Sequence, residues 1–173
     1  MQSIRTGIGY DVHKLVPGSE IILGGIKIPC EFSIEAHSDG DVLCHSIMDA
    51  MLGAAGLGDI GEHFPDTDAK LKGASSMELL KDVNDKLKKA GMKVANIDAI
   101  IILEKPKISE MKVKMKENIA NVIEIDMGRV NIKATTTEKL GSIGRSEGIA
   151  SQAVVTPTRT EERRVGKECR SRW

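Results

Sequence analysis

The chain of 173 residues has few cysteines, few aromatic residues, no net charge and no long apolar run. Its cysteines, Cys30, Cys44 and Cys169, have no paired spacing, which argues against a disulfide framework and a zinc knuckle. Four aromatic residues, with 25 basic against 25 acidic side chains, give no basis for binding nucleic acid. No run of about 18 apolar residues could span a bilayer, and residues 1–5 lack the apolar core of a signal peptide. We therefore expect a cytoplasmic protein without a nucleic-acid or membrane partner.

The last residues differ in composition from the rest of the chain. Residues 161–173 mix basic and acidic side chains with one aliphatic residue and have no usable periodicity, so they cannot bury a face. A solvated basic tail and an anion-binding arm are two interpretations. The run resembles the translation of a common sequencing adapter more than either. We assign residues 1–157 to one domain and exclude the basic tail, residues 158–173, from the fold.

Strand and helix patterns alternate along the domain. The predicted strands are 5–10, 94–103, 129–135 and 149–155, together with a hairpin over 20–28 that turns at Gly24 and Gly25. The predicted helices are 41–55, capped by Asp39 or Ser38, then 75–90 and 108–123. Residues 56–73 are glycine-rich and polar, and we expect a long loop there.

This order of elements predicts an α+β fold, a single domain whose mainly four-stranded sheet is covered by helices on one face. The second face of the sheet is also informative. The apolar run Ile100 to Leu103 suits a strand that is covered on both sides. With helices on one face, a partner subunit could cover the other.

Three residues have the chemistry of a metal site. Asp11 and His13 are two apart at the end of a predicted strand, so both side chains would point the same way. His45 interrupts an apolar helical pattern and needs a partner, although a histidine satisfied within the core is the alternative. Two histidines and one carboxylate suit a tetrahedral zinc site with an open fourth position. Asp41 and Asp49, each four residues from His45, could orient its imidazole, but a structural role is favoured for both.

A second polar cluster, Thr135 to Lys139, combines three hydroxyls, one carboxylate and one ammonium. A threonine-rich strand end is one explanation, since β-branched residues favour strands. A glutamate among phosphate-binding groups is explained better when a hard cation such as magnesium lies between them. Residues 56–61 match the dinucleotide pattern GxGxxG, but a helix precedes them and a loop follows, so that assignment is rejected. Asp59 is then an acid that faces a ligand.

Five motifs in register resemble the 2-C-methyl-D-erythritol 2,4-cyclodiphosphate synthases. They are residues 7–13, 36–41, 57–61, 64–68 and 135–139. The resemblance extends over about residues 5–155 and implies a homotrimer with sites between subunits. It implies conversion of 4-diphosphocytidyl-2-C-methyl-D-erythritol 2-phosphate, a cytidine diphosphate compound, to the cyclic diphosphate with release of CMP. The reaction belongs to the non-mevalonate route to isoprenoids.

The resemblance also implies roles for particular residues. The zinc ligands would be Asp11, His13 and His45, and the residue that contacts a magnesium or manganese ion on the substrate diphosphate would be Glu138. The groups that stabilise the transition state would be His37 and Thr136. The substrate-binding residues would be Asp11, Val12, His13, His37, Ser38, Asp59, Ile60, Gly61, Phe64, Pro65, Asp66, Thr67, Asp68, Leu103, Glu104, Lys105, Pro106, Lys107, Ile108, Ser109, Thr135, Thr136, Thr137, Glu138, Ser142 and Arg145. At Ser142 relatives usually have phenylalanine, and residues 103–107 differ from the commoner Ala-Gln form.

Two other functions fit the same residues. A metal-dependent phosphodiesterase would use water as the attacking group and would incorporate one solvent oxygen, whereas cyclisation incorporates none. The non-enzyme alternative is a trimeric nucleotide- or metal-binding module whose site is inactive. The intact set of metal-type residues argues against such a module.

Overall fold

A computed structural model describes residues 4–65 and 67–160. One sheet has the strand order β4-β1-β7-β5-β6. Its strands are β1 (Gly7–Pro17), β4 (Phe32–Glu35), β5 (Met92–Ile102), β6 (Val130–Thr135) and β7 (Gly148–Arg159). Neighbouring strands are antiparallel except β5 and β6, which are parallel. The predicted hairpin is confirmed as a separate two-stranded sheet of β2 (Glu20–Leu23) and β3 (Ile26–Pro29).

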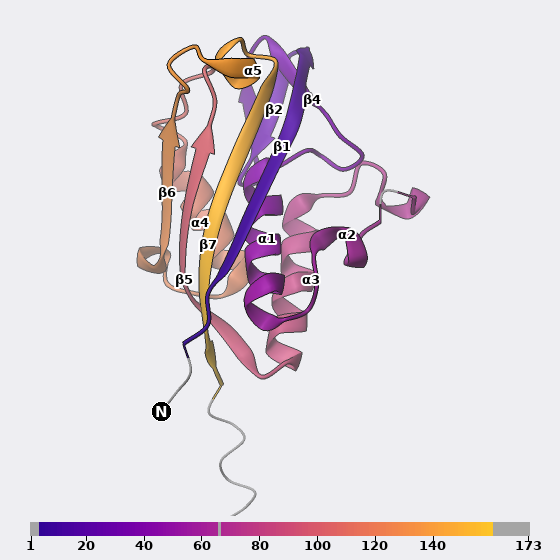
Figure 1. Ribbon diagram of the computed structural model, residues 1–173, viewed down its shortest axis with the longest axis vertical. Coiled ribbons are helices and arrows are strands. Elements are labelled where there is room, and N and C mark those ends of the chain that lie inside the picture. The colour runs from indigo at the N-terminus through magenta and orange to yellow at the C-terminus, as the bar shows by residue number, and fades with distance from the viewer. Residues whose placement is uncertain (1–3, 66, 161–173) are drawn as a thin grey trace, which may run out of the picture.

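Three long helices lie on one face of the sheet, as Figure 1 shows. They are α1 (Val42–Ala55), α3 (Ser76–Lys89) and α4 (Lys112–Ile123). The short helices are α2 (Ile60–His63) and α5 (Gly141–Gly144), and two 3-10 turns are η1 (Ala69–Leu71) and η2 (Met127–Arg129). The α+β architecture with helices on one face is therefore confirmed. None of the helices in the described part of the chain is long and apolar enough to cross a membrane, and the cytoplasmic location stays a prediction from the sequence.

The structure corrects three details of the expected fold. The sheet has five strands rather than mainly four. The prediction missed the short edge strand β4, whose two hydrophobic residues are too few to show a pattern. The cap of α1 is Asp41, whose side chain accepts a hydrogen bond from the Cys44 N–H, rather than Asp39 or Ser38. The predicted long loop contains α2 and η1. Helices of three or four residues are too short to produce a periodic signal.

Helix α1 contacts the middle of the sheet closely enough to exclude side chains on β1. A Cβ atom built on Gly7 would come within 1.9 Å of the Ala50 carbonyl oxygen, and one on Gly9 within 2.0 Å of the Ser46 carbonyl oxygen. Only glycine permits this approach. Eleven of the fourteen residues of α1 are buried, so the helix forms the centre of the core. The close approach is also what brings His45 of α1 against β1.

Strand β1 is longer than predicted, and this moves two of the candidate ligands. It continues to Pro17 because Lys14 pairs with Gly148 of β7 and because its last residues pair with β4. Asp11 and His13 therefore lie within the strand rather than at its end. Both still point to the same side, as their spacing predicts.

The carboxyl-terminal boundary of the domain stays a prediction. Strand β7 extends to Arg159, two residues beyond the expected limit, and the Thr160 N–H donates to the Gly91 carbonyl oxygen at 2.9 Å. Residues 161–173, which resemble a translated adapter, lie outside the described part of the chain.

Candidate functional site

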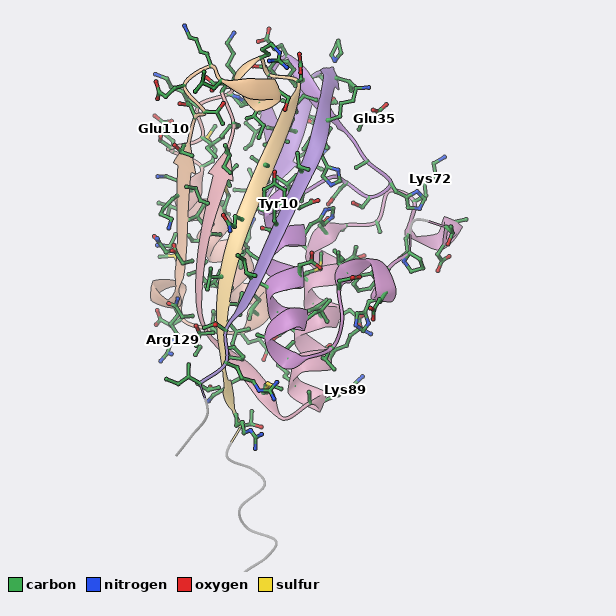
Figure 2. The ribbon with its side chains drawn as sticks, viewed as in Figure 1. Tyr10, Glu35, Lys72, Lys89, Glu110 and Arg129 are labelled. Atoms are coloured by element: carbon green, nitrogen blue, oxygen red, sulfur yellow. The ribbon has the colours of Figure 1, made fainter. Side chains whose placement is uncertain are left out.

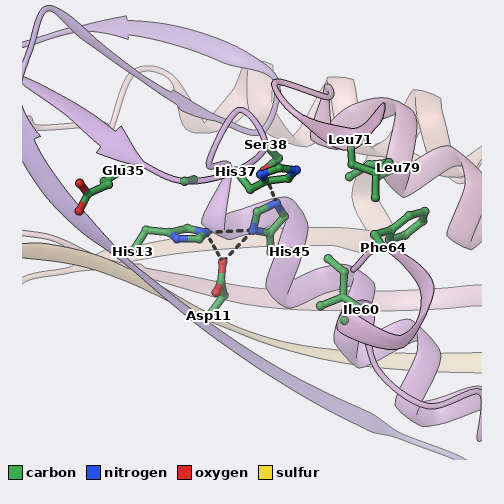
Figure 3. Close-up of a pocket in the computed structure, with 12 residues that line it drawn as sticks. Asp11, His13, Glu35, His37, Ser38, His45, Ile60, Phe64, Leu71 and Leu79 are labelled. Atoms are coloured by element: carbon green, nitrogen blue, oxygen red, sulfur yellow. Dashed lines mark hydrogen bonds and ion pairs between the residues drawn. The ribbon is translucent and has the colours of Figure 1, made fainter. Parts of the chain in front are cut away.

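Asp11, His13 and His45 converge on one point between β1 and α1 (Figure 3). Asp11 Oδ2 lies 2.9 Å from His45 Nδ1 and 3.1 Å from His13 Nε2. The two imidazole nitrogens are themselves 3.1 Å apart. One carboxylate oxygen and two imidazole nitrogens that face each other at these distances are a donor set that a divalent cation would complete. The predicted ligand set is thus brought together, and the cluster is consistent with a metal site.

The charges of the cluster support the same conclusion. Burial by itself would raise the pKa of Asp11, but hydrogen bonds and charges from His13 and His45 outweigh it and hold the pKa well below the ordinary value of 3.8. Burial by itself would lower the pKa of His45, but the hydrogen bond and charge of Asp11, with the charges of Asp41 and Asp39, raise it above 6.5. The surroundings of His45 therefore favour positive charge, which a cation can supply in place of a proton.

A cavity of about 410 Å³ opens beside the three candidate ligands. Its lining residues, shown in Figure 3, are Asp11, His13, Glu35, Ala36, His37, Ser38, His45, Ile60, Gly61, Phe64, Leu71 and Leu79. Eight of the twelve belong to four of the sequence motifs, 7–13, 36–41, 57–61 and 64–68, and they include most of the predicted site residues of the first three. A volume of this size holds a small organic ligand. The structure thus places His37, Ser38, Ile60, Gly61 and Phe64 at one concave site.

The aspartates near this cavity have structural contacts. Asp41 is fully buried, and besides capping α1 it accepts a hydrogen bond from the Gly25 N–H at 2.8 Å. Asp49 accepts from the Ile60 N–H at 2.8 Å, which anchors α2 to α1. Both therefore have the structural roles that the sequence favoured. Asp59 caps α2 through the Glu62 N–H at 3.0 Å.

Of the described residues of the 64–68 motif, Phe64 is the one that lines the cavity. The Asp68 carbonyl oxygen contacts His37 Nε2 at 3.2 Å, which ties this segment to the predicted catalytic histidine. Asp66, predicted to bind substrate, lies outside the described residues. The roles of Pro65, Thr67 and Asp68 stay predictions.

A second group of predicted residues lies at the other edge of the sheet, where β5 and β6 end. Glu104 Oε1 accepts hydrogen bonds from the Thr137 N–H and hydroxyl, at 2.9 and 3.2 Å, and from the Lys139 N–H at 3.2 Å. Segments 103–109 and 135–139 are thereby joined. The Thr136 hydroxyl donates to Glu138 Oε1 at 3.1 Å. Leu103 and Ile108 are buried in the core, so their side chains support this surface from below.

The cluster of Asp11, His13 and His45 and this second group do not meet within one chain. Strands β7 and β5 separate β1 from β6, which corresponds to about 14 Å across the sheet at the usual strand spacing. Ser142 and Arg145 belong to the second group, at helix α5 and its end, and Arg145 Nε donates to Glu147 Oε1 at 2.8 Å. The substrate contacts expected of both groups stay predictions.

Residues that the sequence did not associate with the site also contact it. Glu35, Leu71 and Leu79 line the cavity. Ser76 Oγ lies 3.0 Å from His45 Nε2. The sequence placed Ser76 in a capping pattern, and nothing in that pattern indicates a contact with a histidine 31 residues away. The adjacency arises only when the start of α3 packs against α1.

A candidate cation site beside a cavity, on an α+β domain, is typical of metal-dependent enzymes, and comparison with known proteins shows the family. Residues 4–158 match the model of the YgbB family. The 2-C-methyl-D-erythritol 2,4-cyclodiphosphate synthase of Alkaliphilus oremlandii is 56% identical over 153 residues, which cover 88% of this chain and 98% of the relative. The synthase of Clostridium acetobutylicum is 56% identical over 151 residues, 87% of this chain and 97% of the relative.

Solved structures agree with these sequences. The bifunctional IspDF of Campylobacter jejuni superposes with a TM-score of 0.88 at 49% identity, covering 92% of this chain and 43% of that chain. The CDP complex of IspF from Plasmodium falciparum superposes with a TM-score of 0.80 at 35% identity, covering 92% of this chain and 99% of that chain. The chain therefore belongs to the YgbB family of 2-C-methyl-D-erythritol 2,4-cyclodiphosphate synthases. Its activity is that of a cyclising, CMP-releasing lyase in the non-mevalonate isoprenoid pathway.

Proposed function

We propose that this chain performs its cyclisation at a site built from both edges of the sheet, each edge coming from a different subunit. One subunit would supply Asp11, His13 and His45 with the adjoining cavity, and a neighbour would supply segments 103–109 and 135–139. The observation that carries the proposal is the convergence of three metal-type ligand atoms within 4.8 Å of one another beside a cavity of ligand size. The separation of the two groups within one chain favours a site shared between subunits.

The reaction needs no nucleophile from the protein. The 2-phosphate oxygen of the substrate attacks the β-phosphorus, forming one P–O bond, and the P–O bond to CMP breaks. The chain must fold the substrate so that these atoms meet, and it must neutralise the accumulating negative charge. Zinc and a magnesium or manganese ion, when bound, would supply that neutralisation and would polarise phosphoryl oxygens. Asp11, His13 and His45 would hold zinc, and Glu138 would hold the second ion.

The protein groups then act by position. His37 and Ser38 line the cavity beside the zinc ligands and can donate to phosphate oxygens. Phe64, Leu71 and Leu79 form an apolar wall that reduces the access of water to the reacting phosphorus. In the second group the Thr136 hydroxyl is beside the Glu138 carboxylate, where it can donate to the leaving phosphate. Exclusion of water separates cyclisation from hydrolysis.

The subunits of the proposed homotrimer would meet through the second face of the sheet. Four large apolar side chains point outward there, namely Ile8, Tyr10, Val12 and Val154, with exposed fractions of 41 to 64%. An apolar face of this kind on the surface is typical of an interface. A ring of three subunits closes when each covers part of the next.

Cytidine would bind to the second group. The Plasmodium falciparum relative was solved with CDP. In this chain the Glu104 side chain joins the two segments by accepting from the Thr137 and Lys139 N–H groups, and the joined segments would receive the base and its phosphates. Binding of CDP to the chain, followed by calorimetry, tests this assignment.

Incubation with the diphosphocytidyl substrate in ¹⁸O-labelled water, with and without a chelator, tests the proposed function. We expect equal amounts of CMP and cyclic diphosphate, no ¹⁸O in either product, and loss of turnover with the chelator. One ¹⁸O atom in the products would indicate a phosphodiesterase. No turnover with retained CDP binding would indicate an inactive binding module.

A further inference from the structure

The two ring nitrogens of His45 have different surroundings. Nδ1 faces Asp11 Oδ2 at 2.9 Å and His13 Nε2 at 3.1 Å, on the side where a cation would bind. Nε2 faces two hydroxyl groups, Ser76 Oγ at 3.0 Å and Ser38 Oγ at 3.2 Å. A nitrogen that binds a cation carries no proton, so a neutral His45 that uses Nδ1 must carry its proton on Nε2. That proton needs an acceptor, because the side chain is only 12% exposed.

Ser76 is arranged to be that acceptor. Its hydroxyl donates to Asp39 Oδ1 in a close contact, so its lone pairs remain for the N–H of His45. Its backbone N–H donates to Asp39 Oδ2 at 2.9 Å, and the two bonds together hold the serine in one orientation. Ser76 is completely buried, so water does not compete for its hydroxyl.

Ser38 has a different arrangement. Its hydroxyl oxygen accepts from the Gly40 N–H at 3.2 Å. Its side chain lines the cavity, where a ligand would meet it. The Ser38 hydroxyl is therefore better placed to turn toward a substrate, and Ser76 has no such second use.

We propose that Ser76, oriented by Asp39, is a positioning residue for the metal site. The chain of donors runs from His45 Nε2–H to Ser76 Oγ–H to Asp39, and it holds His45 in the tautomer that leaves Nδ1 free for zinc. This inference rests on the proposed zinc site. Groups that orient metal-binding histidines in this way typically change metal affinity by about 10–100-fold when they are removed.

The same residues also have a structural role, which can be separated from the proposed one. Ser75 makes no side-chain hydrogen bond at the start of α3, and Asp39 takes over as the cap by accepting from the Ser76 N–H. That contact uses the backbone of Ser76. Replacement of the side chain therefore removes the hydroxyl but keeps the cap.

Zinc affinity of the full-length chain, measured by competition with a chromophoric chelator, tests the inference. Ser76→Ala should weaken zinc binding by about 10–100-fold. Ser76→Thr and Ser76→Val have nearly the same shape and differ in the hydroxyl, so Thr should bind zinc at least tenfold more tightly than Val. Ser46→Ala is the matched control, because the Ser46 hydroxyl is buried on the same helix as His45 but pairs with Ser151 at 2.9 Å. Its zinc affinity should equal that of the parent.

Each of the remaining outcomes would contradict one part of the proposal. A parent chain that binds no zinc refutes the proposed zinc site itself. A parent that binds zinc while folded Ser76→Ala binds it as tightly overturns the role of Ser76, and a loss in Ser38→Ala instead would assign that role to Ser38. Equal affinities of the Thr and Val variants would show that shape rather than the hydroxyl matters. If Ser76→Ala does not fold by circular dichroism, the Thr and Val pair decides the question.

Discussion

Thr137 donates both its backbone N–H and its hydroxyl to one oxygen of Glu104, at 2.9 and 3.2 Å. Partial burial by itself would raise the pKa of this carboxyl, but the hydrogen bonds that it accepts outweigh burial and hold the pKa below its usual value. The next two residues, Glu138 and Lys139, have positive φ angles of 53° and 64°, a backbone conformation that costs energy outside glycine. Glu104 therefore keeps a strained segment in the shape that presents Thr136 and Glu138.

Removal of this acceptor should impair catalysis more than folding. Glu104→Ala should lower kcat/KM for CMP release by about tenfold or more, because the segment loses its anchor. Glu104→Gln keeps an acceptor oxygen and should stay within a few-fold of the parent. Glu110→Ala, at an exposed residue near the same end of the sheet (Figure 2), is the control and should have no effect. Parent-like kinetics of Glu104→Ala would contradict the anchoring role.

The proposed zinc site and the proposed catalytic threonine should separate in two variants. His45→Ala removes one of the three proposed ligands, and its zinc content after dialysis should fall below a tenth of the parent's. Thr136→Ala should keep full zinc and lower turnover by about 10²-fold, the effect of deleting one donor to transition-state charge. Elemental analysis and CMP release measure the two quantities. Full zinc and full activity in His45→Ala would show that the ligand assignment is wrong.

Without metal, stability should depend on pH through Asp11 and His45. The pKa of His45 is raised above 6.5, so its contribution is complete below pH 6.5 and is lost as pH rises through the raised pKa. The pKa of Asp11 is lowered, so its contribution is present above pH 3.8 and is lost as pH falls toward the lowered pKa. The melting temperature of chelator-treated protein should therefore be highest between about pH 4 and 6.5.

Zinc should reverse the trend on the alkaline side. Zinc binding requires His45 to lose its proton, so the increase in melting temperature on adding zinc should grow from about pH 6 to 8. Thermal denaturation with and without zinc measures both effects. His45→Gln is the control, and its metal-free melting temperature should decline less than that of the parent above pH 6.5. Equal declines would remove His45 as the cause.

The contact between β1 and α1 should tolerate no methyl group at Gly9. Gly9→Ala would place a Cβ 2.0 Å from the Ser46 carbonyl oxygen, so the helix must shift and the free energy of unfolding should fall by about 1–3 kcal/mol or more. Gly53→Ala is the matched control on α1, since a Cβ there meets nothing within 4 Å. It should stabilise the protein by about 0.5–1 kcal/mol, because alanine loses less entropy in a helix. Urea denaturation of both variants measures the free energy of unfolding. Equal changes at the two positions would contradict this account.

The second face of the sheet, opposite the helices, should control assembly. Tyr10 lies at the centre of that face in Figure 2 and is 55% exposed in the single chain. Tyr10→Glu would bury a charge in the proposed interface, and light scattering should then report one chain of 18.7 kDa instead of three. Val113→Glu, at a 64% exposed residue of α4, is the control and should keep the trimer. A monomeric parent would refute the trimer, and a trimeric Tyr10→Glu would place its interface elsewhere.

The sequence by itself determined the chemistry of this protein and most of its local structure. The spacing of Asp11 and His13, the histidine within an apolar helix and the threonine-rich segment after β6 predicted the two groups of the site. These patterns are local, and a period of two or 3.6 residues is visible without knowledge of partners. The short strand β4 and helix α2 were missed because four residues carry too little of either period.

Only the tertiary structure decided which of these residues meet. Strand β1 extends through Asp11 and His13 because β7 and β4 pair with it, and His45 reaches them because two glycines let α1 approach. Ser76 contacts His45 from a helix 31 residues away, and the sheet order separates β1 from β6. Strand order and helix packing depend on the simultaneous burial of many side chains that are far apart in the sequence. No single motif therefore predicts them.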